Sequence, residues 1–157
     1  MKAADTPTTP RRRHWARHAW SLLAALLLAA AWGSVVQAHW NMQALSALGV
    51  EIPALLRLQT IGHDLVRFLP VYAGIVAAGW LPALGLASWI ASHRPAWRNL
   101  LMAAGAAAGM AAAVRTVDAL APMPVFIDAT RHLPGMLLMA LGAALAGLLH
   151  ARLTPPR

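Results

Sequence analysis

Four long apolar runs, almost free of charge, constrain the fold of this chain more than any other feature. A bilayer core about 30 Å thick needs roughly 20 helical residues to cross it. The runs cover residues of about 20–40, 68–92, 99–121 and 133–151. Lipid offers no partners for backbone N–H and C=O groups, and the runs do not alternate between apolar and polar residues as barrel strands do. Each run is therefore predicted to be a transmembrane helix.

The composition also predicts an apolar exterior. Hydrophobic residues make up 59% of the 157 residues and charged residues 11%, whereas soluble domains have about 45–50% and about 25%. We therefore expect an all-α integral membrane four-helix bundle. Cysteine is absent, which excludes disulfides, thiolate metal sites and cysteine nucleophiles.

The distribution of basic residues predicts an orientation. With the amino terminus in the cytoplasm, nine of the thirteen Lys and Arg residues fall on the inner side, which then carries the whole net charge of +8. The positive-inside rule favours this arrangement. It gives a basic cytoplasmic tail at 1–19, a membrane domain at 20–152 and a short cytoplasmic tail at 153–157. The bias towards Ala, Leu and Arg is typical of GC-rich bacterial genomes, so we expect a bacterial inner membrane.

The basic stretch Arg11–Arg17 before the first run has two interpretations. It resembles the start of a signal peptide, and Val36-Gln37-Ala38 resembles a cleavage site. The uncharged run is longer than the 7–15 residues of a signal core, so an uncleaved first span is favoured, while removal of residues 1–38 stays the alternative. The basic stretch is predicted to contact anionic lipid, at about 1 kcal/mol per basic residue. No base-reading motif accompanies it, so no nucleic-acid partner is expected.

A shorter amphipathic helix is expected between the first two spans, at about 53–67. Its apolar residues recur at helical spacings of three and four, and a second face carries charged and polar residues. The apolar face consists of Ala54, Leu58, Ile61, Leu65 and Phe68. We expect this helix to lie on the outer interface and to lead into the second span.

Ionisable residues near the outer ends of the spans form the main candidate site. Arg115 and Asp118 lie one turn apart in the last part of the third run. A charge inside the membrane is costly unless it is paired, so such residues are functional candidates. The pair is interpreted as a structural ion pair, as part of a polar transport route, or as side chains that reach the interface. The full set is Asp64, Arg67, Arg115, Asp118, Asp128 and Arg131.

Three histidines, His39, His63 and His132, fall on the same outer side. Histidine and carboxylate are ligands for transition metals, and two facing histidines can hold a haem iron. No recognised metal-binding spacing is present, so the preferred interpretation is hydrogen-bonded interfacial histidines without a cofactor. A haem or a transition metal is the alternative. The inner histidines His14, His18, His93 and His150 are expected at headgroup level, without a metal.

Small residues predict where the spans pack. Gly105 and Gly109 form a GxxxG pattern in the Ala-rich third run, and Ala143 and Gly147 repeat the small-residue spacing in the fourth. Small residues allow close helix contact in lipid. The third span is expected to lie between other helices or to form a face for a second copy.

The sequence predicts a small multi-pass membrane protein that serves as a structural or accessory subunit of a membrane assembly, with another membrane protein or itself as partner. No phosphate-binding, hydrolase or dinucleotide motif is present, so an enzyme is not expected. One alternative is a small oligomeric transporter or channel that uses Arg115 and Asp118. The other is a metal- or haem-binding protein that uses the outer histidines.

Overall fold

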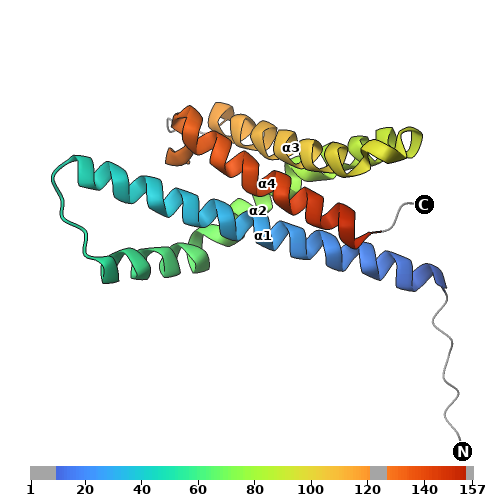
Figure 1. Ribbon diagram of the computed structural model, residues 1–157. Helices are drawn as coiled ribbons and strands as arrows, with labels where there is room; N and C mark the ends of the chain where they lie inside the picture. Colours follow the sequence, from blue (N-terminus) through green and yellow to red (C-terminus); the bar gives the residue numbers. More distant parts are fainter. Residues whose placement is uncertain (1–9, 121–126, 155–157) are drawn as a thin grey trace, which may run out of the picture.

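Four helices, joined by short connections, account for nearly all of the described chain (Figure 1). The computed structural model describes residues 10–120 and 127–154. The helices are α1 (Pro10–Ala47), α2 (Ala54–His93), α3 (Arg98–Leu120) and α4 (Leu133–Leu153), with 3-10 turns η1 (Pro95–Trp97) and η2 (Asp128–Arg131) before α3 and α4. Each helix packs against two others, in the order α1–α2–α3–α4 and back to α1. The predicted four-helix bundle is confirmed.

All four helices are long and apolar enough to cross a membrane. Their exteriors carry large apolar side chains such as Leu27, Leu81, Trp89, Leu141 and Leu145, each at least 45% exposed. Water would disfavour such a surface, whereas lipid solvates it. The chain is therefore a multi-pass membrane protein, as the four apolar runs predict.

The two long helices extend past the two short ones. At 1.5 Å per residue, α1 with 38 residues and α2 with 40 residues are about 57 and about 60 Å long. The 23 residues of α3 and the 21 of α4 give about 35 and about 32 Å by the same rise. Figure 1 shows the surplus of α1 and α2 as a hairpin that projects beyond α3 and α4. We call this the hairpin end, and the opposite end, where α1 begins and α4 ends, the terminal end.

The predicted amphipathic helix is continuous with the second span. Residues 54–67 form the first turns of α2, which then runs without a break to His93 and includes Pro70 and Pro82. The sequence pattern predicts the helical conformation of this segment but not its fusion with the span. The reason is that the change of polar pattern near Phe68 alters which residues face lipid without ending the helix, which continues through Pro70.

Glycine ends α1 at the hairpin turn. Gly49 has φ +84°, a conformation that side-chain-bearing residues rarely adopt. Its N–H donates to the carbonyl of Ser46 at 3.0 Å, and the N–H of Val50 donates to that of Leu45 at 3.3 Å. These bonds satisfy carbonyls at the end of the helix. The chain then turns back, and α2 begins after Pro53.

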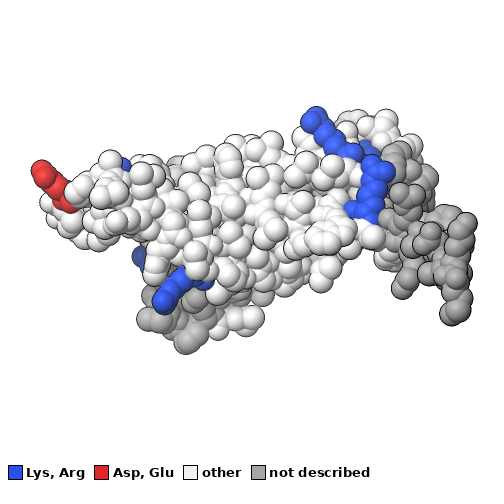
Figure 2. Space-filling model, turned by 90° about the horizontal axis from the view of Figure 1, so that it is seen from below, with Lys and Arg blue, Asp and Glu red and all other residues white. Residues whose placement is uncertain are grey.

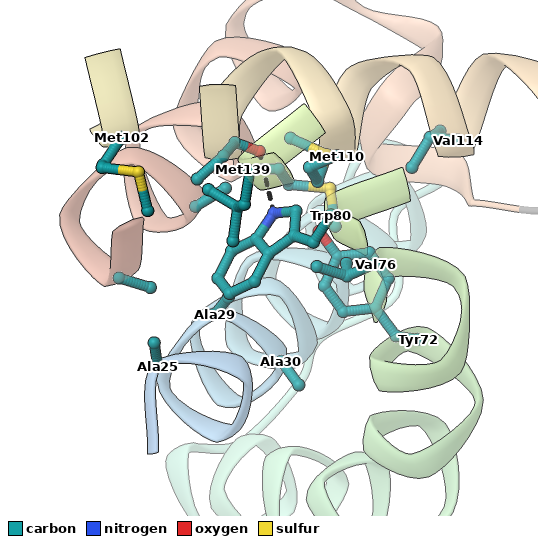
Figure 3. Packing of buried hydrophobic residues seen from close by; sticks show 14 of the residues in the cluster. Ala25, Ala29, Ala30, Tyr72, Val76, Trp80, Met102, Met110, Val114 and Met139 are labelled. Atoms are coloured by element: carbon teal, nitrogen blue, oxygen red, sulfur yellow. Dashed lines mark hydrogen bonds between the residues drawn. The ribbon is translucent and has the colours of Figure 1, made fainter. Parts of the chain in front are cut away.

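The core combines a few large side chains with many small ones (Figure 3). Trp80 and Tyr72 of α2 are fully buried with Met110 and Val114 of α3 and Met139 of α4. The indole N–H of Trp80 donates to the backbone carbonyl of Ala106 at 2.8 Å, which satisfies a donor that lipid cannot. Alanines of α1, among them Ala25, Ala29 and Ala30, complete the cluster.

Candidate functional sites

The predicted polar residues lie along the hairpin end. In α3, Arg115 is exposed and Asp118 is half-buried. In α2, Asp64 is half-buried and Arg67 is exposed. Arg131 is exposed in η2, and the side chain of Asp128 lies outside the described part of the chain. Asp118 and Arg131 each interact with other groups of the protein. A transport role for these residues stays a prediction.

The predicted metal-binding histidines lie on α1, on α2 and at the residue before α4. His39 is exposed on α1, where its Nε2 lies 2.9 Å from Nε2 of Gln43 and its ring meets Trp40 edge-on. His63 is exposed on α2, and His132 directly precedes α4. Within residues 10–120 and 127–154, no group of three His, Asp or Glu side chains is placed to hold a metal ion. A metal or haem role for these histidines stays a prediction.

The small residues of the third and fourth spans form the seams of this bundle. A Cβ atom on Gly109 would lie 2.8 Å from both the carbonyl oxygen of Gly79 and the Cβ atom of Ala83 in α2. A Cβ atom on Gly147 would lie 2.6 Å from the carbonyl oxygen of Met102 in α3. Gly105 meets α2 in the same way, and Ala143 is buried. In this structure α3 is thus held between α2 and α4.

An apolar groove follows the outer side of the seam between α2 and α3. Its volume is about 910 Å³. The walls are mostly small residues, several of them exposed: Gly74, Ala78 and Pro82 of α2, and Ala108 and Ala112 of α3. A Cβ atom on Gly74 would meet nothing within 4 Å. We call this feature the α2–α3 groove.

At the terminal end, two arginines hold the last turn of α4. The Nε of Arg17 from α1 donates to the carbonyl of Leu153 at 2.8 Å. Arg98 from α3 donates through Nη1 to the carbonyl of Ala151 and through Nη2 to Oγ1 of Thr154, the latter at 2.8 Å. The last carbonyls of a helix lack partners within it and carry partial negative charge. The guanidinium groups supply both the donors and the positive charge.

A histidine pair lies beneath these arginines. His150 of α4 is only 8% exposed, and its ring meets that of His18 of α1 edge-on at 6.1 Å. Ser21 of α1 donates to the carbonyl of His18, and its Oγ lies 2.9 Å from Nδ1 of His150. The contact with Ser21 ties the ring of His150 to α1. The sequence predicts that His150 lies at headgroup level, and it does not indicate that the side chain is buried.

His150 also faces a second cavity, between α1 and α2, with a volume of about 260 Å³. We call it the α1–α2 cavity. Apart from His150 and Ser88, its walls are apolar or aromatic. The residues are Leu22, Leu26, Ala77, Trp80, Leu81, Leu84, Gly85, Ser88 and His150. The sequence offers only one hint of this site, a histidine followed by Ala and Arg at the end of an otherwise uncharged span.

Comparison of the chain with models of known protein families, with curated proteins and with solved structures finds no match.

Proposed function

We propose that this protein is an accessory subunit of a membrane assembly and that it holds a transmembrane helix of a partner protein in the α2–α3 groove. The observation that carries the proposal is the groove itself, which is long, apolar and lined by small residues on the lipid-facing side of the bundle. Lipid tails are as apolar as leucine, so helices associate in a bilayer through close packing rather than through hydrophobic burial. A groove with exposed Gly74, Ala78 and Ala112 allows that close approach.

A different protein fits the groove better than a second copy does. A twofold dimer that packs groove to groove would place two concave surfaces against each other. The exposed ridge of Leu137, Leu141 and Leu145 on α4 would fit the groove of a neighbour only in a head-to-tail contact. Such a contact forms a ring or continues without closing. A single partner helix fills the groove without either consequence.

The test compares two glycine substitutions in the same helix. Gly74→Leu places a side chain in the α2–α3 groove, whereas Gly85→Leu places one in the cavity between α1 and α2. At both positions a new Cβ atom would meet nothing within 4 Å. Leucine has a higher helix propensity than glycine, so both variants are expected to fold. The protein is purified from its own membranes in mild detergent, and its mass is measured by light scattering.

We expect the unsubstituted protein and Gly85→Leu to carry one membrane partner in fixed stoichiometry, and Gly74→Leu to lose it. A photoreactive residue at position 78 should then crosslink to that partner, while one at position 145 on α4 should not. A protein that purifies alone, or only as copies of itself, would overturn the proposal.

A further inference from the structure

We propose that the α1–α2 cavity is a binding site for an anionic phospholipid, with an acyl chain in the cavity and the phosphate at His150 and Arg17. The proposal is independent of the α2–α3 groove, which lies on the other side of α2. It rests on three features, namely the shape of the cavity, the placement of His150 and the basic charge of the terminal end.

The cavity has the position and length of one acyl chain. Along α2 its walls run from Ala77 to Ser88, which is about 16 Å at the helical rise. One leaflet of the bilayer core is about 15 Å thick. Leu81, Gly85 and Ser88 are exposed on the outer surface of the bundle, so the cavity is accessible from lipid. Its aliphatic lining matches a hydrocarbon chain.

His150 gives the cavity a polar end. The side chain is more than nine-tenths buried, and its Nδ1 is held by Ser21. His150 is the one ionisable side chain among the described residues that line the cavity. An imidazole carries both a donor and an acceptor nitrogen, so it offers a headgroup a hydrogen-bonding group at the edge of an otherwise apolar site.

The charge of the terminal end, whose arginines we call the basic rim, favours a negatively charged ligand. The described residues of the terminal end contain Arg17, Arg94, Arg98 and Arg152 but no Asp or Glu. Figure 2 shows only basic charge at this end of the view, whereas the opposite end carries both basic and acidic atoms. Basic sites between transmembrane helices bind anionic headgroups. A zwitterionic lipid offers the same chain and phosphate but adds a cation that the rim repels.

The test measures lipid binding to the purified, full-length protein by native mass spectrometry. The probes are phosphatidylglycerol and phosphatidylcholine with identical acyl chains, offered separately at equal concentration. We expect one phosphatidylglycerol molecule to remain bound at collision energies that remove phosphatidylcholine. We also expect a rise in melting temperature with phosphatidylglycerol that is at least twice the rise with phosphatidylcholine.

Gly85→Leu is the decisive variant, because its side chain would occupy the cavity, while its Cβ atom would have no neighbouring atom within 4 Å. It should lose the retained lipid and the thermal shift, and Gly74→Leu should keep both. His150→Phe, which keeps an aromatic ring but removes both ring nitrogens, should reduce the preference for phosphatidylglycerol at least fivefold. Equal retention of both lipids, or retention that survives Gly85→Leu, would overturn the proposal. Loss of the partner from Gly74→Leu with its lipid retained would separate this site from the proposed function.

Discussion

At the scale of single residues, the glycines divide into those that packing requires and those that it does not. Gly109 lies at the contact between α3 and α2, where an added Cβ atom would be 2.8 Å from backbone and side-chain atoms. Gly109→Val must therefore push the two helices apart, which in a packed core costs about 1–3 kcal/mol. We expect a melting temperature in detergent several degrees below that of the unsubstituted protein.

Gly62→Val is the matched control, because position 62 is an exposed helical glycine with no atom within 4 Å of a new Cβ. Valine has a higher helix propensity than glycine, so its melting temperature should stay level or rise. Equal losses at both positions would show that the α2–α3 seam is looser than described. The GxxxG pattern in the sequence identifies Gly109 as a contact residue, but it does not identify the partner. A homodimer and an internal helix contact need the same small residues.

At the scale of elements, η2 is attached to α1 by one buried side chain. Gln37 accepts a hydrogen bond from the N–H of Ala129 at 2.9 Å, and its own Nε2 donates to Oδ1 of Asn41 at 3.3 Å. Gln37→Leu would leave the N–H of Ala129 buried and unpaired, at a cost of about 1–3 kcal/mol. We expect faster hydrogen exchange in residues 127–133, measured by mass spectrometry, while α2 and α3 exchange as before. Gln43→Leu, an exposed change on the same helix, should leave exchange in η2 unchanged; acceleration by both variants alike would contradict this role.

The contrast between helices and sites has a physical cause at this scale. Apolar length alone predicts the four spans, because a bilayer demands about 20 helical residues for each crossing. Other features depend on contacts between residues far apart in the chain. They are the hydrogen bond of Gln37 to η2, the hydrogen bonds of Arg17 and Arg98 to the end of α4, and the burial of His150. The helical periodicity of apolar residues in the sequence does not predict such contacts. The ionisable residues that the sequence marks as a candidate site lie at the hairpin end, whereas the contacts of Arg17, Arg98 and His150 lie at the terminal end.

At the scale of the whole molecule, the asymmetry of charge between the two ends predicts how the bundle sits in the membrane. Among the described residues the terminal end has only basic charges, whereas the hairpin end mixes four arginines with acidic residues. The positive-inside rule therefore predicts a cytoplasmic terminal end. The chain has no cysteine, so single cysteines report position without background. Leu48, which is 80% exposed between α1 and α2, and Ala96, exposed in η1, mark opposite ends.

In bacterial spheroplasts, a membrane-impermeant maleimide should label Leu48→Cys at once and should label Ala96→Cys only after detergent is added. The reverse pattern would place the basic rim outside and would remove the charge argument for a cytoplasmic terminal end. Equal labelling at both positions would contradict a single orientation. The outcome also bears on the lipid site, because the predicted orientation places the α1–α2 cavity in the cytoplasmic leaflet, where anionic lipid gives that surface its negative potential. If the terminal end is cytoplasmic, the basic residues there would account both for the orientation of the chain and for its proposed anionic ligand.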